Sequence, residues 1–488
     1  MLANLARAEA WPTEGGHDVC VCGSGPAGMT VARELSARGA RVLLLEAGGV
    51  WTTDESNAIY AASSIGPLKH WGVSSCRLRQ FGGTSGHWQG RCAVLDDIDF
   101  EPRDIWGMQG WPIARAEAYS RLADAKVILD IDDQSLDRRD EPLWRDARLV
   151  PSGYARSAPT RFASKYGAEL KASRSIDVVL NANVVDVTFN DDRNAVAALT
   201  VSDYRGRRFS VSAKYFVMAF GSLENARFLL NISDSAGFPF GGAMAGRCFM
   251  EHFEVMLGRF VPFDSPLWRR QGPLSLTIAA ARAKQLGSGN AVVSLAKNAD
   301  QRHYGRLASI KNIRNEMKCA TERDSPEKDA GRHRLCHGDG AATSIIEQAP
   351  NPSSRVVLDR TAKDQFGQAR LAVDWRLAPQ DVHTIRAVAE ETGKALAEQD
   401  VARFQMAESV LAGHPYVGFH CHQMGTTRMS TDRTHGVVDA DLKVHGMKNF
   451  YIAGSSVFPT AGCANPTVTL TALALRLGEH LAARLARR

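Results

Sequence analysis

One segment near the start of the chain constrains the fold most strongly, residues 17–49, HDVCVCGSGPAGMTVARELSARGARVLLLEAGG. Residues 18–22 predict a strand buried on both faces, because an apolar run, Val19 to Cys22, follows Asp18. The next residues predict a helix, because Ala27, Val31 and Leu35 recur every four positions, and Gly39 is placed to end it. Residues 41–46 then predict a second buried strand. The segment therefore predicts the strand–helix–strand start of an α/β fold.

Three glycines connect the first strand to the helix in a GxGxxG pattern. Gly23 permits a tight turn, Gly25 allows a pyrophosphate to approach the backbone, and Gly28 allows the helix to pack on the strand. Glu46 follows Gly23 by 23 residues and can accept hydrogen bonds from a ribose diol. Dinucleotide binding is the expected function, and the alternative is an unoccupied α/β turn. The motif does not separate FAD from NAD, although a single copy at the start of the chain favours FAD.

A second glycine cluster, RQFGGTSGHWQGRCA, places Gly82, Gly83, Gly86 and Gly90 within nine residues. So much glycine allows a backbone to lie against a flat ligand. One interpretation is a loop that covers an edge of a flavin ring. The other is a surface loop in which His87 and Trp88 only pack, and the residues alone leave both open.

The C-terminal region combines a strand, a loop and a helix. NFYIAG predicts a strand ending at Gly454, with Ser455 and Ser456 as small hydrogen-bond donors. Residues 465–488 predict a helix, with Pro466 at its first position and Asn465 as the N-cap. Its buried stripe is Leu470, Leu473, Leu477 and Leu481. The positive end of this helix could face a flavin pyrimidine ring, or Asn465 could serve only as a cap.

Composition excludes several other functions. The net charge of +6 over 488 residues is small, and the basic stretch 301–335 also carries acids, so we expect a solvated loop or lid and no nucleic-acid binding. The nine cysteines contain no CxxC pair, which favours reduced thiols and a cytoplasmic location. We find no secretory signal and no apolar run long enough to span a bilayer, so no direct membrane insertion is expected.

The chain resembles the glucose–methanol–choline (GMC) family of flavoprotein oxidoreductases. The resemblance rests on GSGPAG…LLLEAGG, FGGTSGHW, AFGSLENARFLL, EQAPNPSSRVVLD, HQMGTTRM and NFYIAGSSVFPTAGCANPTVTLTALAL, which span nearly the whole chain in the family's order. HQMGTTRM together with ANPTVT is most similar to the branch with pyranose 2-oxidase and bacterial sugar and polyol dehydrogenases. The glucose oxidase branch usually has a second histidine at the position of Asn465.

The resemblance implies a Rossmann-like FAD-binding domain, formed by residues 1–255 and 411–488. It also implies a substrate domain at 256–410, with a large mixed or antiparallel sheet flanked by helices. SRVVLD and ARLAVDWRL are expected as strands of that sheet, and residues 379–401 as a helix packed on it. Residues 180–220 are expected to form hairpin strands of the FAD half, with Val184 and Val185 near adenine.

The resemblance also assigns chemistry to GFHCHQMGTTRM, residues 418–429. His422 aligns with the family's active-site histidine, and Asn465 with its partner at the substrate oxygen. A neutral imidazole with a pKa of about 6.5 can accept the proton of an alcohol while the hydride passes to flavin N5. His420 matches no functional position and is expected to pack. The two histidines could share a face, but no third ligand has suitable spacing, so no metal site is expected.

The expected cofactor is FAD, with a covalent bond from His87 to the flavin left open. The substrate is expected to be a sugar, polyol or glycoside alcohol, and the electron acceptor oxygen, a quinone or a redox protein. A homo-oligomer is also compatible with the sequence, which does not determine the oligomeric state. The residues expected to bind the cofactor are Gly23, Gly25, Gly28, Glu46, Gly82, Gly83, Ser85, His87, Val185, Gly454, Ser455, Asn465, Pro466 and Thr467.

Two other functions remain open at this stage. The chain could be the flavin subunit of a membrane-linked dehydrogenase complex that passes electrons to a cytochrome or quinone. It could also be an FAD-containing lyase without net redox chemistry, as some members of the family are. Residues 256–345 are expected to determine which substrate binds, but they contain no recognisable motif. We expect their basic residues to be exposed to water and not to bind an anionic substrate. Gln348 could line the pocket.

Overall fold

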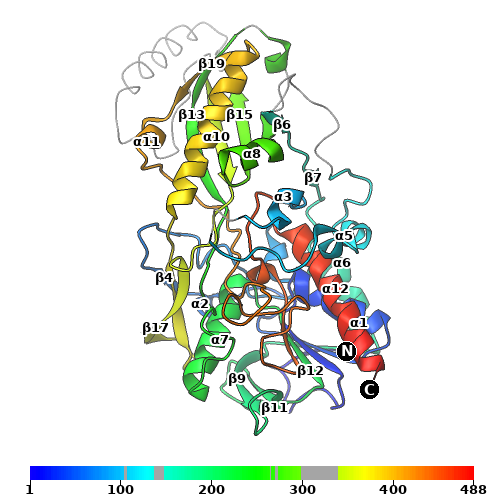
Figure 1. The fold of residues 1–488 in the computed structure, drawn as a ribbon. Helices are drawn as coiled ribbons and strands as arrows, with labels where there is room; N and C mark the ends of the chain where they lie inside the picture. Colours follow the sequence, from blue (N-terminus) through cyan, green and yellow to red (C-terminus); the bar gives the residue numbers. More distant parts are fainter. Residues whose placement is uncertain (104–106, 137–147, 264, 270–272, 298–338, 488) are drawn as a thin grey trace, which may run out of the picture.

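The fold is described from a computed structural model, which covers residues 1–103, 107–136, 148–263, 265–269, 273–297 and 339–487. The basic stretch 301–335 therefore lies outside the described residues. Two hydrophobic cores organise the rest of the chain, one around a parallel sheet and one around an antiparallel sheet. The two sheets occupy the lower and upper parts of Figure 1.

The first sheet has six parallel strands in the order β1-β8-β3-β2-β12-β20. β2 and β3 are buried at every position, because helices and loops cover both faces of the sheet. The predicted strand–helix–strand segment is confirmed as β2, α1 and β3. The strands are β1 (Leu2–Asn4), β2 (Val19–Cys22), β3 (Val42–Glu46), β8 (Ile176–Leu180), β12 (Tyr215–Met218) and β20 (Phe450–Ile452).

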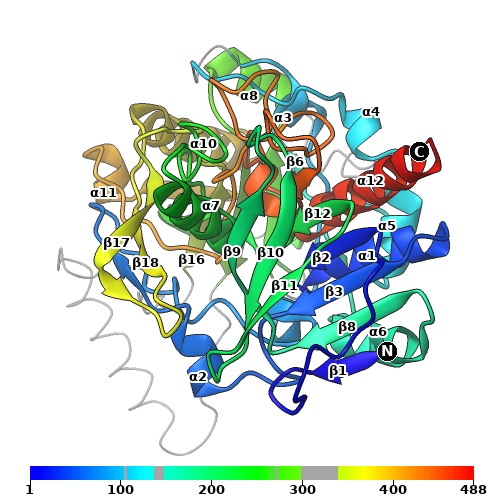
Figure 2. The same ribbon diagram turned by 90° about the horizontal axis from the view of Figure 1, so that it is seen from below.

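Helix α12 (Thr467–Ala486) packs against α1 (Pro26–Ala37), so residues more than 400 positions apart form one layer beside the sheet. Figure 2 shows the two helices next to each other. Leu473, Leu477 and Leu481 are buried as predicted, whereas Leu470 is partly buried. Gly478 allows the close contact, since a Cβ there would lie 2.7 Å from the Glu34 side chain.

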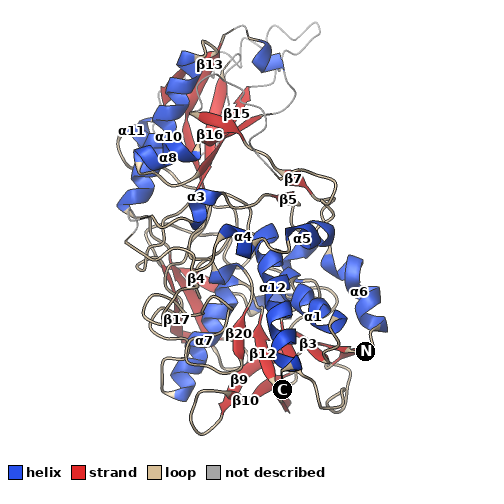
Figure 3. Cartoon of the chain, turned by 45° about the vertical axis from the view of Figure 1, so that its right-hand side comes forward, coloured by secondary structure: helices blue, strands red, loops and turns tan. Residues whose placement is uncertain are grey.

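The second sheet has six antiparallel strands in the order β19-β13-β16-β15-β14-β6. Helix α10 (Pro379–Glu398) lies along one face, as Figure 3 shows, and its buried residues face the strands. The expected antiparallel sheet and its flanking helix are thereby confirmed. The strands are β6 (Leu149–Pro151), β13 (Phe253–Pro262), β14 (Leu274–Ile278), β15 (Ala291–Lys297), β16 (Gly340–Ile346) and β19 (Ala402–Met406).

The expectation for SRVVLD and ARLAVDWRL was wrong in one respect. Both form strands, β17 (Arg355–Lys363) and β18 (Ala369–Asp374), but they pair with each other and with β4 (Ala62–Ser64) in a separate sheet. The alternating pattern predicts a strand but not the strand with which it pairs, because strand pairing depends on residues distant in the sequence. A further sheet, β9 (Asn183–Phe189), β10 (Val196–Ser202) and β11 (Arg208–Val211), confirms the hairpin strands expected at 180–220.

The described ranges contain further helices, 3₁₀ helices and a two-stranded sheet of β5 and β7. They are α2 (Asp54–Ala58), η1 (Gly83–Gly86), β5 (Arg91–Cys92), α3 (Asp97–Phe100), α4 (Arg115–Ala118), α5 (Leu122–Ile128), β7 (Ala155–Arg156), α6 (Phe162–Ala172), α7 (Ser222–Ala236), η3 (Pro266–Arg269), α8 (Ala280–Leu286), α11 (Glu408–Leu411) and η5 (Ser455–Val457). None of the helices in the described ranges combines the length and apolar character needed to cross a membrane.

Candidate active site

A cavity of about 760 Å³ lies between the β2–α1 turn, the second glycine cluster and the start of α12. Its volume falls within the range of about 300–1,000 Å³ that is usual for ligand pockets. Most of the predicted site residues line it. They are Gly23, Gly25, Glu46, Gly83, Ser85, His87, Val185, His422, Gly454, Ser455, Asn465, Pro466 and Thr467. Gly28 and Gly82 do not line the cavity, but Gly28 lies against Gly23 and Gly82 is next to Gly83, both of which do.

The β2–α1 turn requires its glycines. Gly23 adopts a left-handed φ of +105°, and a Cβ at Gly28 would overlap the carbonyl oxygen of Gly23. Glu46 lies at the end of β3, where its carboxylate accepts hydrogen bonds from the N–H groups of Ser24 (3.0 Å) and Gly48 (2.8 Å). Burial raises the pKa of Glu46, and these donors oppose that effect.

The second glycine cluster lies against this turn. Gly82 donates its N–H to Ser24 Oγ at 3.1 Å, and a Cβ at Gly83 would lie 3.0 Å from the Cα of Gly25. Ser85 is buried and accepts the N–H of Phe162 at 3.1 Å. His87 reaches the cavity from this loop, with Nε2 3.2 Å from the carbonyl oxygen of Cys76. The loop thus forms part of the cavity wall, and covalent flavin attachment at His87 stays a prediction.

His422 and Asn465 meet at the cavity although 43 residues separate them. Asn465 Nδ2 lies 3.2 Å from His422 Nε2. Asn465 is not the N-cap that the sequence predicted, because α12 begins at Thr467 with Pro466 in the cap position and no side-chain cap. Its amide therefore remains available to the cavity. His422 Nδ1, on the other side of the ring, lies 3.0 Å from His252 Nδ1.

Burial and neighbouring positive charge keep these imidazoles neutral. The pKa of His422 lies well below its usual value, because of burial first and then the proximity of His252, His420 and Arg91. Burial lowers the pKa of His252 to about 4. Both rings are therefore uncharged near pH 7, as a proton acceptor must be.

His420 lies in the same wall with its ring stacked on that of His422, at a centroid distance of 5.9 Å. Its Nε2 is 3.7 Å from a carboxylate oxygen of the half-exposed Glu254. Within the described ranges, no three His, Cys, Asp or Glu side chains are grouped as metal ligands.

The expectation of reduced thiols was wrong for one pair of cysteines. Cys76 and Cys421 form a disulfide in the cavity wall, with their Cα atoms 5.8 Å apart. Their sequence separation of 345 residues gives no local signal, so only the fold brings them together. The cysteines without a disulfide in the described ranges are buried, namely Cys20, Cys22, Cys92, Cys248 and Cys463.

Sequence reasoning missed several polar residues of this region. His252 and Glu251 lie directly before β13, and both are fully buried. Arg91 also lines the cavity and stacks over the Tyr154 ring at 4.5 Å. FMEHFEV, the local sequence around His252, resembles an ordinary strand start, so no signal other than an ionisable pair within an apolar run distinguishes it.

The residues present fit a flavin dinucleotide. The glycine turn and loop allow close approach, and Glu46 lies beside them. Two buried donors in the cavity wall, Arg79 Nε and Gln423 Nε2, have no hydrogen-bond partner within the described residues. A large, acceptor-rich ligand would satisfy such donors.

Comparison with known proteins agrees with this geometry. Residues 18–232 match the family model of FAD-dependent oxidoreductases, and residues 350–474 match the GMC oxidoreductase model. The fructose dehydrogenase large subunit of Gluconobacter japonicus is 25% identical over 320 residues, covering 64% of this chain and 55% of that protein. The C-glycoside 3-oxidase of Arthrobacter globiformis is 33% identical over 138 residues, covering 27% and 24%.

The chain thus aligns with about half the length of the first relative and a quarter of the second. Among solved structures, pyridoxine 4-oxidase from Mesorbium loti has the same fold. It has a TM-score of 0.59 and 17% identity, and the match covers 95% of this chain and 99% of that one. The two family models and the cavity between their segments lead to one conclusion: this chain joins an FAD-dependent oxidoreductase region to a C-terminal GMC oxidoreductase region, and its cofactor is FAD.

Proposed function

We propose that the protein oxidises a primary or secondary alcohol group of a sugar, polyol or glycoside, with FAD as cofactor. The observation that carries this proposal is the His422–Asn465 pair, 3.2 Å apart in the wall of the dinucleotide cavity. The printed names of the two relatives, a fructose dehydrogenase subunit and a C-glycoside 3-oxidase, support a sugar or glycoside as substrate.

The β2–α1 turn, Glu46, Val185 and the loop around Gly83 would hold the cofactor, together with the start of α12. When bound, FAD supplies the acceptor for the two electrons that leave the carbon bearing the hydroxyl group. His422 accepts the hydroxyl proton at Nε2. This acceptor is needed because the pKa of an alcohol lies far above 7. The Asn465 amide donates to the same region and orients the substrate oxygen.

Anaerobic flavin bleaching tests the proposal. The FAD-loaded protein would be mixed without oxygen with D-glucose, D-fructose, glycerol and a methyl glucoside. We expect at least one to bleach the flavin, and His422→Ala to slow the bleaching by roughly 10²–10⁴-fold. FAD content should stay unchanged in that variant. His414→Ala, an exposed histidine eight residues earlier, is the control and should bleach at the normal rate.

Two results would contradict this function. One is a His422→Ala variant with the full bleaching rate. The other is a substrate that is consumed while the flavin stays yellow, which would indicate lyase chemistry instead.

A second function is favoured by the name of one relative, which is the large subunit of a dehydrogenase. In this version the chain is the flavin subunit of a complex and transfers its electrons to a cytochrome or quinone. Purification from the native source with a haem protein attached would support it. A chain that purifies alone and reduces oxygen at a normal turnover rate would count against it.

A further inference from the structure

His252 is the partner of His422 on the side away from the cavity. It directly precedes β13 and is fully buried. Its Nδ1 is 3.0 Å from His422 Nδ1, and its Nε2 is 3.3 Å from the carbonyl oxygen of Ala461. The two rings meet edge to face, at an interplanar angle of 86° and a centroid distance of 5.1 Å. Each ring nitrogen of His252 therefore has a hydrogen-bond partner.

These contacts determine where the ring protons lie. A carbonyl oxygen can only accept, so His252 Nε2 must donate to Ala461. A neutral His252 then has a bare Nδ1, which accepts the proton on His422 Nδ1. Because His422 is also neutral, its second nitrogen, Nε2, carries only a lone pair. That lone pair faces the amide of Asn465.

We propose that His252 is a positioning residue, which holds the ring proton of His422 on Nδ1 and leaves Nε2 of His422 free to act as the base. This inference rests on the proposed function, since it concerns the same proton transfer. When His422 takes the hydroxyl proton on Nε2, its Nδ1–H still donates to His252. One hydrogen bond thus supports the ring before and after the transfer.

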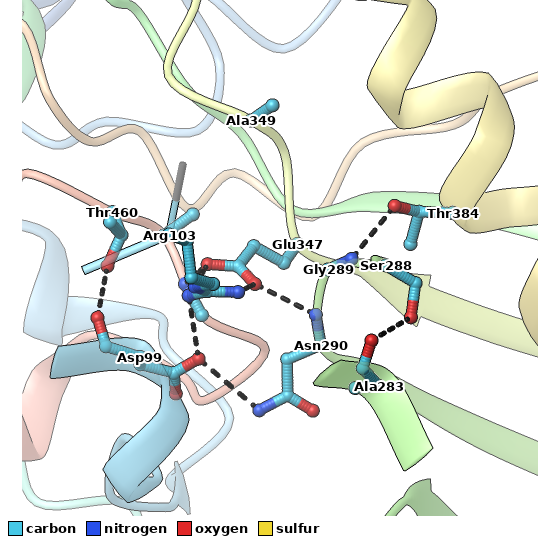
Figure 4. A network of polar contacts seen from close by, with 12 residues as sticks. Asp99, Arg103, Ala283, Ser288, Gly289, Asn290, Glu347, Ala349, Thr384 and Thr460 are labelled. Atoms are coloured by element: carbon cyan, nitrogen blue, oxygen red, sulfur yellow. Dashed lines mark hydrogen bonds and ion pairs between the residues drawn. The ribbon is translucent and has the colours of Figure 1, made fainter. Parts of the chain in front are cut away.

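The residues before and after Ala461 are both hydrogen-bonded, and Figure 4 shows the contacts of Thr460, Asp99, Arg103 and Glu347 in this network. Thr460 Oγ1 donates to the carbonyl oxygen of Asp99 at 3.0 Å, and the N–H of Gly462 donates to Glu347 Oε1 at 2.9 Å. The Arg103 guanidinium binds both oxygens of Glu347, at 2.8 and 2.9 Å. A fixed acceptor at residue 461 keeps the His252 ring, and with it the His422 ring, in one orientation.

The two backbones are also joined directly. Glu251 Oε1 accepts the N–H of His252 at 3.0 Å and that of His422 at 2.5 Å. Met250 and Met424 exchange backbone hydrogen bonds of 3.0 and 2.9 Å, in the manner of neighbouring antiparallel strands. The contact between the imidazoles therefore does not depend on flexible loops.

The first experiment compares His252→Leu with His252→Asn in the FAD-loaded protein. Leucine fills similar space but cannot accept, whereas the asparagine carbonyl can accept from His422 Nδ1. We expect His252→Leu to reduce the rate of flavin bleaching by the best sugar or polyol of the panel roughly 10- to 100-fold. His252→Asn should recover most of that rate. The control is His17→Leu. His17 is also buried, but it lies before β2, at the end away from the glycine turn, so this variant should bleach its flavin at the normal rate.

The second experiment determines which ring nitrogen of His422 carries the proton, and it does not require catalytic turnover. Nitrogen NMR of ¹⁵N-histidine-labelled protein, with and without His422→Ala to assign the signals, should show His422 protonated on Nδ1 and bare on Nε2. His252→Asn should keep this pattern, and His252→Leu should lose it. The inference is overturned if wild-type His422 carries its proton on Nε2, or if His252→Leu bleaches at the wild-type rate. A fully active His422→Ala variant would instead overturn the assignment of His422 as the base. The two failures can be distinguished, because the NMR spectrum reports the position of the ring proton independently of activity.

Discussion

At the scale of single residues, Arg91 is the charge whose effect on the chemistry can be measured. It lines the cavity, and its positive charge contributes to lowering the pKa of His422. Its guanidinium has no hydrogen bond or ion pair to any residue in the described ranges, only the stacking contact with Tyr154. Its field therefore acts on the cavity without a neutralising partner.

Arg91→Gln should shift the acidic limb of the pH profile. His422 must be neutral to accept a proton, so kcat/KM falls as pH drops through its pKa, which lies below 6.5. Removing a nearby positive charge raises that pKa, so the acidic limb should move to higher pH. Arg156→Gln is the matched control, since Arg156 pairs with Arg91 across β5 and β7 but is exposed. If the acidic limb of the pH profile is unchanged in Arg91→Gln, the charge of Arg91 does not affect the pKa of His422.

At the scale of elements, Glu391 fastens α10 to the antiparallel sheet layer. Its carboxylate accepts from Arg282 Nε (2.7 Å), Arg148 Nη1 (2.9 Å) and Lys394 Nζ (3.1 Å), although its side chain is only 1% exposed. The Arg282 hydrogen bond is the largest of the influences that lower the pKa of Glu391 to about 2. Its folded pKa is thus below its unfolded one.

Because the pKa of Glu391 is lowered by folding, its contribution to stability depends on pH. The stabilisation is fully present above the ordinary pKa of 4.5 and is lost as the pH falls towards 2. Glu391→Gln should lower the free energy of unfolding at pH 7 by roughly 1.5–3 kcal/mol, and less at pH 3. Glu390→Gln is the control, because among the described residues that neighbour pairs with Arg386 on the surface, a contact worth about 0.3–0.5 kcal/mol. Urea unfolding at both pH values measures the difference, and equal losses for the two variants would refute it.

The elements also show what the sequence can predict. β2, α1 and β3 follow from local information, because their apolar period and glycine spacing are complete within 30 residues. The pairing of β4 with β18 does not, since their register depends on segments about 300 residues apart. In the site, His422 and Asn465 come from the family resemblance. His252 was not predicted, because its role exists only through a contact across 170 residues.

At the scale of the whole molecule, the Cys76–Cys421 disulfide joins the loop before the second glycine cluster to the segment that carries His422. It also removes the argument that led from reduced cysteines to a cytoplasmic location, since disulfides in the cytosol are rare and usually redox-active. A link across 345 residues stabilises the fold by about 6 kcal/mol in the chain-entropy description.

Peptide mapping under non-reducing conditions tests this link. We expect a fragment in which the Cys76 and Cys421 peptides are joined, and two more reactive thiols after reduction of the denatured protein. The double variant Cys76→Ser, Cys421→Ser should unfold at lower urea concentration than the wild type. Cys92→Ser, at a buried free thiol, serves as the control. Recovery of both peptides as free thiols from protein purified without reductant would contradict the link.

The order of strands in the parallel sheet has a consequence for biosynthesis. β20 adds beside β12, and α12 covers α1, so the sheet and the helix layer beside it cannot be completed until residues 450–486 have been translated. At about 5–20 residues per second, roughly 20–90 s pass on the ribosome between β2 and β20. During that interval the face of α1 that packs against α12 lacks its partner, although α1 can already pack on β2 and β3. Cofactor loading should accordingly follow release of the finished polypeptide, so truncated nascent chains should emerge colourless.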